Sequence, residues 1–262
     1  MVVSTNNMST SNERLGELLK RDEFPLSSRY DPQWIIDNQM GPNALWLTEW
    51  LCKDLELHSG MRILDLGCGK GLSSIFLAKE YVVQVWATDL WISATDNSKR
   101  IQQAGVSDMV FPIHAEARSL PYAEEFFDAI VCVDAYIYFG TDDLYLDYLH
   151  KFVKPGGQIG IVLPGFMQEL DGPLPEHLVP FWAQECWTWH TMEWWERHWS
   201  RTGLVEVELV ERMPGGCDLW LQWERARMAA GDDDESLRTD IEVIGSDRGE
   251  FMGFIRMIAR RR

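Results

Sequence analysis

The sequence is poor in basic residues. Its 262 residues include 24 Lys and Arg against 41 Asp and Glu, which gives a formal net charge of −17. Proteins that bind nucleic acids or anionic membranes present clustered Lys and Arg side chains. Here such a cluster occurs at Arg260-Arg261-Arg262, which we interpret as a frayed tail. We therefore expect neither a nucleic-acid partner nor stable membrane association.

Long apolar runs and paired cysteines are also missing. No apolar stretch approaches the ~18 residues of a membrane span, and residues 1–12 lack the basic and apolar regions of a secretory signal. The five cysteines are widely spaced and include no C-x-x-C pair, which argues against a disulfide framework and a zinc site. We expect a soluble cytoplasmic protein without a metal, loosely ordered over residues 1–13, and the sequence also permits a homodimer.

Short apolar runs alternate with amphipathic segments in the central part of the chain. The pattern predicts strands at 62–66, 82–87, 110–114, 129–133 and 158–163, and helices at 72–80, 93–104 and 144–152. Strands that alternate with helices form a parallel sheet covered on both faces. We therefore expect an α/β fold, a Rossmann-like three-layer sandwich.

The flanking segments have a different character. Asp31 is expected to cap a helix that begins at Pro32, and the acidic run 232–235 is interpreted as a solvated loop. Further helices are expected at 15–19, 43–55 and 218–230, and further strands at 204–210 and 250–258. The expected organisation is an N-terminal helical cap (1–57), a ligand-binding core (58–163), a Trp-rich lid insertion (164–202) and a C-terminal part that completes the sheet (203–262).

A glycine-rich segment, Asp65-Leu66-Gly67-Cys68-Gly69-Lys70-Gly71, lies between a predicted strand and a predicted helix. Glycines let a backbone approach a ligand closely, and a helix start offers free N–H groups. A dinucleotide-binding loop would have a small residue at the position of Leu72, and the carboxylate of Asp65 opposes a pyrophosphate but suits an ammonium group. The loop therefore favours an adenosine that carries an amino acid over NAD.

Polar residues also follow the next strands. Asp89 lies 18 residues beyond Gly71, where a carboxylate grips a ribose diol. Glu116 and Ala117 follow the third strand, where they can meet an adenine edge, and Asp134 follows the fourth. Because the carboxyl ends of parallel strands meet at one edge of a sheet, we expect a single cleft.

These motifs together resemble the class I S-adenosylmethionine-dependent methyltransferases. The resemblance covers about residues 40–165 and rests on 65–71, Asp89, 116–117, 127–130 and 154–157, in this order. It implies a seven-stranded, mostly parallel sheet whose last strand is antiparallel. It also implies S-adenosylmethionine as methyl donor, with Asp65 near the methionine amine, although Glu116 stands where the family more often has Asp. The cofactor-binding residues that it implies are Asp65, Gly67, Cys68, Gly69, Asp89, Leu90, Trp91, Ala115, Glu116, Ala117 and Val133.

The resemblance implies an in-line displacement at a sulfonium methyl group. The sulfonium is already activated, so the protein mainly supplies alignment and desolvation. A base is needed only when the nucleophile carries a proton. The candidates just past the fourth strand are Asp134, Tyr136 and Tyr138, and the alternative for both tyrosines is core packing.

Tryptophan is concentrated in the insertion. Six of the 13 tryptophans are Trp182, Trp187, Trp189, Trp194, Trp195 and Trp199. We favour a hydrophobic clamp that holds the lid to the sheet over an aromatic box for a cationic substrate. The candidate substrate-binding residues are Tyr30, Trp34, Asn38, Met40, Trp187, His190 and Trp195, with Trp46 and His198 as further candidates and helix packing as the alternative.

The leading functional hypothesis is a methyltransferase that acts on a small molecule. A thiol is slightly preferred as acceptor because a thiolate needs little help from a base. N-methylation of a small amine and C-methylation of a lipid or quinol are the alternatives, and the lack of an evident metal site disfavours catechol-type O-methylation. A non-catalytic S-adenosylmethionine-binding module is the alternative from another class, and Leu72 and Asp65 disfavour a nicotinamide dehydrogenase.

Overall fold

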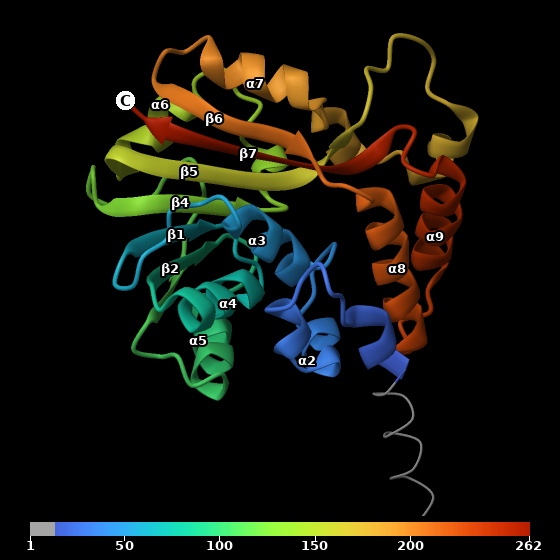
Figure 1. Ribbon diagram of the computed structural model, residues 1–262, viewed down its shortest axis with the longest axis horizontal. Coiled ribbons are helices and arrows are strands. Elements are labelled where there is room, and N and C mark those ends of the chain that lie inside the picture. Colours follow the sequence, from blue (N-terminus) through green and yellow to red (C-terminus); the bar gives the residue numbers. More distant parts are fainter. Residues whose placement is uncertain (1–13) are drawn as a thin grey trace, which may run out of the picture.

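The computed structural model describes residues 14–262, so the loose order expected for residues 1–13 lies outside the described residues. Within this part, seven strands form one sheet in the order β3-β2-β1-β4-β5-β7-β6 (Figure 1). β7 is antiparallel to both of its neighbours, which confirms the expected sheet. The strands are β1 (Arg62–Leu66), β2 (Gln84–Asp89), β3 (Val110–His114), β4 (Phe127–Val133), β5 (Val153–Phe166), β6 (Val205–Arg212) and β7 (Met252–Arg261).

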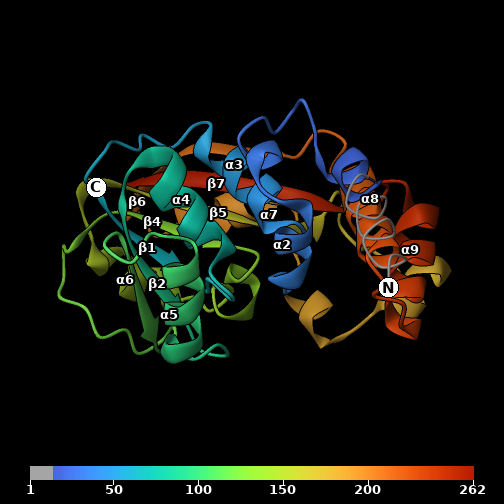
Figure 2. The ribbon, with the colours of Figure 1, turned by 90° about the horizontal axis from the view of Figure 1, so that it is seen from below.

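Helices cover the sheet and extend beyond one end of it. α3 and α4 pack against each other and against the central strands, whereas α7 packs on β6 and β7. α8 and α9 lie side by side beyond the end of the strands, next to the N-terminal helices (Figures 1 and 2). The helices are α2 (Pro32–Asp37), α3 (Ala44–Cys52), α4 (Leu72–Tyr81), α5 (Ala94–Gln103), α6 (Tyr145–Leu149), α7 (Met192–Ser200), α8 (Gly216–Ala229) and α9 (Glu235–Asp247), with 3-10 turns η1 (Ser27–Arg29), η2 (Tyr136–Tyr138), η3 (His150–Phe152), η4 (Glu176–Phe181) and η5 (Gln184–Thr188).

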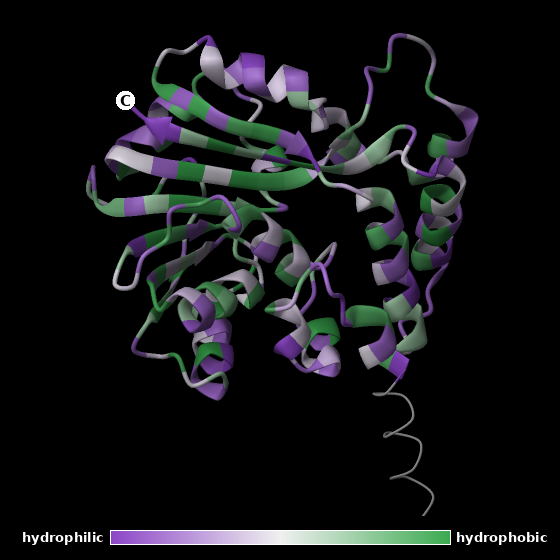
Figure 3. Cartoon of the chain, viewed as in Figure 1, coloured by the Kyte–Doolittle hydropathy of each residue, from purple (hydrophilic) through white to green (hydrophobic). Residues whose placement is uncertain are grey.

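Side-chain caps fix where several helices begin. Asp31 accepts a hydrogen bond from the Trp34 amide at 2.8 Å, with Pro32 in the first turn, as the sequence predicts. Asn43 caps α3 in the same way. Apolar and polar residues alternate along the helices and strands (Figure 3), and the buried apolar residues form one core cluster. Within residues 14–262, no helix has both the length and the apolar character needed to cross a membrane.

Strand β5 is longer than expected. The sequence predicts a break at 154–157 and a strand at 158–163, but β5 runs through both segments. Phe127 pairs with Val153 and Ala129 with Gln158, so residues 154–157 bulge opposite the single residue Asp128. The bulge lets Pro155 enter a strand without breaking the ladder on either side.

The acidic run is mostly an exposed loop, as the sequence indicates, and it leads into a helix that the sequence does not predict. Asp232 pairs with Arg227 at 2.7 Å, Asp233 pairs with Arg238 at 2.8 Å, and Asp234 caps α9. Helix α9 itself is absent from the prediction, although Leu237 and Ile244 lie on one helical face and are buried. These carboxylates therefore start a helix that packs on α8.

Two of the three C-terminal arginines belong to a strand, so the interpretation of this segment as a frayed tail is wrong for Arg260 and Arg261. Arg260 and Arg261 belong to β7. Arg260 pairs with Glu56 at 3.0 Å, and Arg261 pairs with Glu125 at 3.1 Å. Both arginines are therefore engaged in ion pairs at the end of β7.

Most of the tryptophans of residues 164–202 pack this segment against the rest of the chain. Trp195 and Trp199, four residues apart on α7, are fully buried and contact the ring of Tyr136. Trp189 is buried against Phe166 of β5, whereas Trp187 is 65% exposed. This arrangement is the hydrophobic clamp rather than an aromatic box.

Candidate active site

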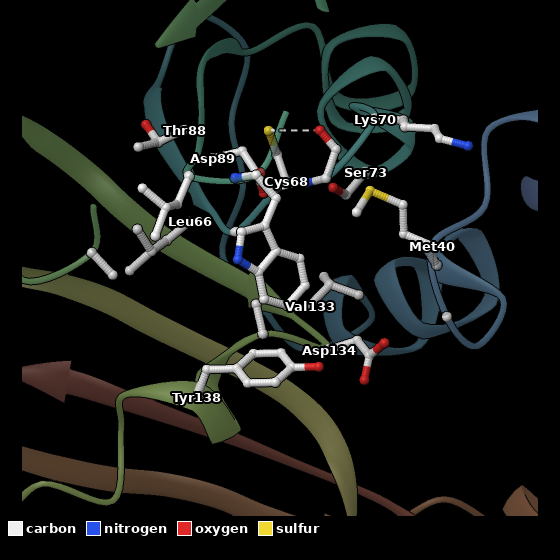
Figure 4. Close-up of a pocket in the computed structure, with 18 of the residues that line it drawn as sticks. Met40, Leu66, Cys68, Lys70, Ser73, Thr88, Asp89, Val133, Asp134 and Tyr138 are labelled. Atoms are coloured by element: carbon white, nitrogen blue, oxygen red, sulfur yellow. Dashed lines mark hydrogen bonds between the residues drawn. The ribbon is translucent and has the colours of Figure 1, made fainter. Parts of the chain in front are cut away.

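A cleft of about 1020 Å³, counting the part open to solvent, lies at the carboxyl ends of β1, β2, β3 and β4 (Figure 4). We call the residues 66–73, 88–91 and 115–118 that line it the cofactor wall, and the residues 38–44 and 133–139 that line it the acceptor wall. Of the expected cofactor-binding residues, all except Asp65 line the cleft: Gly67, Cys68, Gly69, Asp89, Leu90, Trp91, Ala115, Glu116, Ala117 and Val133.

The glycine loop brings its backbone to the floor of the cleft. Gly67 has φ of +76°, and a Cβ there would lie 2.3 Å from the Cβ of Ala135. Only glycine fits both this left-handed conformation and this close approach. α4 then begins at Leu72 without a side-chain cap. Its first N–H groups are therefore available to a ligand.

Asp89 holds the cofactor wall together. Its Oδ2 accepts a hydrogen bond from the Gly69 amide at 2.8 Å, and its Oδ1 accepts from the amides of Trp91 and Ile92 at 2.7 and 2.8 Å. The carboxylate also lines the cleft, where it can accept hydrogen bonds from hydroxyl groups. Its position suits the ribose role that the resemblance implies.

Asp65 lies beneath the loop rather than in the cleft. Its Oδ2 accepts hydrogen bonds from the hydroxyls of Ser73 and Ser74 at 2.6 and 2.5 Å, whereas its Oδ1 is buried and has no partner among residues 14–262. Burial raises the pKa of Asp65 to about 6. Since Ser73 lines the cleft, Asp65 can reach a ligand through this hydroxyl. An unpartnered carboxylate oxygen at this depth fits a cationic ligand group.

Asp134 projects from the acceptor wall. It follows β4 directly, has a left-handed backbone with φ of +56°, and its amide donates to the Val162 carbonyl at 2.8 Å. Non-glycine residues in this conformation are uncommon and cluster at functional sites. Burial and then the negative charge of Glu224 raise the pKa of Asp134 to about 7. A carboxyl group with such a pKa can accept a proton near neutral pH.

The N-terminal cap completes the acceptor wall. Asn38, Met40, Gly41 and Pro42 line the cleft across from Asp134. Gly41 is packed so closely that a Cβ there would lie 2.5 Å from the Asp134 Oδ2. Its carbonyl accepts a hydrogen bond at 2.8 Å from the indole of Trp223, a buried residue of α8.

The two candidate tyrosines are in different environments. Tyr138 lines the cleft, its hydroxyl points toward Asp134 (Figure 4), and burial raises its pKa to about 12. Tyr136 is fully buried among Trp195, Trp199 and Phe139, away from the cleft. Tyr136 therefore packs in the core, which was the alternative to a catalytic role.

Most of the aromatic candidates for substrate binding lie outside the cleft. Tyr30 stacks on Trp34 at 5.6 Å and donates its hydroxyl hydrogen to Glu80. His190 stacks on Trp194 at 3.7 Å. Of the expected substrate-binding residues, the cleft is lined by Asn38 and Met40, but not by Tyr30, Trp34, Trp187, His190 or Trp195; Trp46 and His198 do not line it either.

The sequence pattern does not identify several residues of the site. Gly41 and Pro42 are visible there only as the end of a helix, and Phe139 only as part of an apolar run. From α8, far away in the chain, Trp223 contacts the acceptor wall at Gly41, and the charge of Glu224 acts on Asp134. In residues 14–262, no group of three or more His, Cys, Asp or Glu side chains is arranged to hold a metal ion.

Comparisons with known proteins agree with this geometry. Residues 63–157 match the profile of a family described as a methyltransferase domain. The chain is 28% identical over 116 residues to the methyltransferase GfsG of Streptomyces halstedii, a match that covers 44% of this chain and 42% of that protein. The chain thus spans less than half the length of this curated relative.

Solved structures share the fold over most of the chain. The phosphoethanolamine N-methyltransferase 2 of Haemonchus contortus, solved with S-adenosyl-L-methionine, has a TM-score of 0.72 at 20% identity and covers 94% of this chain and 60% of that one. The [4+2]-cyclase SpnF has a TM-score of 0.65 at 18% identity, with coverage of 86% and 84%. The strand order, the glycine loop and the match over residues 63–157 agree with one another: this part of the chain matches a methyltransferase domain, and the chain shares the fold of these solved structures.

Proposed function

We propose that this protein transfers a methyl group from S-adenosylmethionine to a small molecule. The observation that carries the proposal is the convergence of the glycine loop, Asp89 and Glu116 on one cleft with an ionisable carboxyl group, Asp134, on its opposite wall. The family match over residues 63–157 supports the same activity. A fold alone does not decide an activity, since a cyclase shares this one.

The cofactor wall would hold the methyl donor in one orientation. The backbone at Gly67 and Gly69 would face the methionine part, Ser73 and Asp65 its amine, Asp89 the ribose hydroxyls, and the 116–117 backbone the adenine. When bound, the donor supplies a methyl group already activated by a sulfonium. The residues of this chain then have to align the acceptor and exclude water.

Asp134 would accept a proton from the acceptor. Its carboxylate has no hydrogen-bond partner among residues 14–262 and faces the cleft, and its raised pKa matches a base that works near pH 7. Tyr138 would border the acceptor on the same side.

The thiol preference expected from the sequence gains no support from the acceptor wall. A carboxylate next to a thiol disfavours the thiolate and raises the pKa of the thiol. Asp134 is such a carboxylate. Acceptors that carry a proton on nitrogen or oxygen fit this wall better than a thiol does.

Calorimetry tests the donor site directly. We expect S-adenosylmethionine and S-adenosylhomocysteine to bind the full chain and NAD not to bind. Asp89→Ala should weaken both ligands at least about 10-fold, because the carboxylate is lost from the cleft and its three amide donors are released. Unchanged affinity in this variant would refute the ribose assignment, and NAD binding would refute the proposed donor.

Methyl transfer itself is tested by a screen of amines, phenols, thiols and lipids, read out as S-adenosylhomocysteine formed. For any acceptor that carries a transferable proton, Asp134→Asn should lower kcat about 100-fold or more and leave donor affinity within about 2-fold. Wild-type activity should decline as the pH falls below about 7, because Asp134 becomes protonated. A variant with wild-type kcat would exclude Asp134 as the base.

A further inference from the structure

The acceptor wall carries a carboxyl group that has no cation paired with it among residues 14–262 and that is charged mainly above about pH 7, because burial raises the pKa of Asp134 to about 7. Asp134 is half-buried at the edge of the cleft, and its carboxylate has no ion-pair partner among residues 14–262. Buried or half-buried carboxylates are normally paired or hydrogen-bonded. Such a group therefore points to a ligand that brings the positive charge.

The charge of a second carboxylate acts on the first. Glu224 on α8 is 3% exposed, and its charge acts on Asp134. Glu224 pairs with Arg227 at 2.7 Å, but this guanidinium also pairs with Asp232 at 2.7 Å. One cation is thus shared between two acids. Burial raises the pKa of Glu224 to about 7, so the surroundings of Asp134 are negative above this pH.

The positive side chains of the cleft are engaged elsewhere. Among the residues that line it, Lys70 and Arg118 carry positive charge. Arg118 pairs with Glu116 at 3.1 Å on the cofactor wall. Lys70 donates to the Asp37 carbonyl at 3.3 Å and points away from Asp134 (Figure 4). A phosphate next to Asp134 would meet a carboxylate and no compensating cation.

An aromatic ring completes the environment of this carboxylate. Tyr138 is 45% exposed, its hydroxyl points toward Asp134 (Figure 4), and its ring meets that of Trp91 edge-on at 5.1 Å. A carboxylate next to an aromatic ring is a combination that binds ammonium groups, through charge-assisted hydrogen bonds and cation–π attraction.

We propose that the methyl acceptor is a small phosphate-free amine that binds as an ammonium ion between Asp134 and Tyr138. This inference rests on the proposed function. The ammonium group gives one proton to the Asp134 carboxylate. The nitrogen lone pair then forms a bond to the methyl carbon of the sulfonium donor, while the carbon–sulfur bond breaks and its electron pair stays on sulfur. The methylated nitrogen keeps one positive charge, and the proton leaves Asp134 through the open cleft.

The proposed acceptor differs from the one for which a structural neighbour is named. The Haemonchus contortus enzyme is named for phosphoethanolamine, a phosphorylated amine. The acceptor wall of this chain instead matches the amine end of such a molecule and repels the phosphate end.

The test uses calorimetry on the full chain saturated with S-adenosylhomocysteine at pH 8. Three probes of equal shape are compared: 2-phenylethylamine, 2-phenylethanol and 2-phenylethanethiol. We expect the amine to bind about 10-fold or more tightly than the other two, because the alcohol and the thiol cannot form the ion pair. Ethanolamine should also bind more tightly than phosphoethanolamine.

Two variants that each remove one negative charge show whether Asp134 causes the amine preference. Asp134→Asn should remove the amine preference, whereas Asp108→Asn, an exposed acid outside the cleft, should keep it. Equal affinity for the three phenyl probes, tighter binding of phosphoethanolamine, or an amine preference that survives Asp134→Asn overturns the inference alone. Failure of S-adenosylhomocysteine to bind the wild type overturns the proposed function, and the inference with it.

Discussion

The cofactor wall and the acceptor wall face the same cleft but are assembled differently. The cofactor wall consists of the ends of β1, β2 and β3, each close in sequence to the next. The acceptor wall joins residues 38–44 to residues 133–139, and Trp223 of α8 holds this junction from a third part of the chain. A local motif thus sets the first wall, and long-range packing sets the second.

The carboxylates of the two walls show the same contrast. Asp89 accepts three backbone hydrogen bonds, so it fixes the loops around it. Asp134 accepts none among residues 14–262, and burial together with Glu224 raises its pKa to about 7. A fully hydrogen-bonded acid serves structure and binding, whereas an unpartnered acid is free to exchange a proton.

The largest expected effect concerns the cofactor wall. Gly67→Ala should weaken S-adenosylhomocysteine more than about 100-fold and lower the free energy of unfolding by about 2–4 kcal/mol, because the new Cβ combines backbone strain with a collision. Gly203→Ala is the matched control, since Gly203 has φ of +69° with open space around it. Calorimetry and urea unfolding measure both. Equal losses in the two variants would mean that the contact with Ala135 is unimportant.

A smaller effect is expected at Trp223, whose indole donates a hydrogen bond to Gly41 of the acceptor wall. Trp223→Phe removes the hydrogen bond to Gly41, so 2-phenylethylamine should bind the S-adenosylhomocysteine-loaded protein about 2- to 10-fold more weakly. Donor affinity should not change. Trp199→Phe is the control, because its equally buried indole has no hydrogen-bond partner among residues 14–262. A similar loss in both variants would assign Trp223 to packing alone.

The unpartnered carboxylate of Asp134 should also lower the free energy of unfolding. The pKa of Asp134 is raised from 3.8 to about 7, so the native state binds the extra proton between these pH values and wild-type stability falls as the pH rises through this range. Asp134→Asn should therefore be about 1 kcal/mol more stable than wild type above pH 7. The difference should vanish below about pH 4. Urea unfolding at several pH values checks this, and a pH-independent difference would contradict it.

The smallest effect is expected for the hydrogen bond between Lys70 of the cofactor wall and Asp37, which directly precedes the acceptor wall. Lys70 donates a hydrogen bond to the Asp37 carbonyl at 3.3 Å in a solvent-exposed position. Lys70→Met should change S-adenosylhomocysteine affinity by less than about 2-fold and stability by less than about 0.5 kcal/mol. A larger effect would show that this link, and not α8, joins the walls.

The sequence predicts the core strands and most of the cofactor wall because their signals are local. The strands at 62–66 and 110–114 have the predicted bounds. The aromatic candidates Tyr30 and Trp195 fail to reach the cleft because hydrophobic residues in a cap or lid pack equally well against helices. The sequence analysis does not predict α9, because the acidic residues at its start resemble a solvated loop although the helix has a buried apolar face.

The amino-acid pattern by itself determined the sheet, the glycine loop and the carboxylate that follows each strand, since strand period, glycine conformation and strand-end chemistry act over a few residues. The scarcity of basic side chains can be connected with the site only in the folded chain, where Arg227 is shared between two acids and Arg118 is paired. Asp134 has no ion-pair partner among residues 14–262. The tertiary structure decided this, because burial and distance, rather than composition, set the interaction between charges.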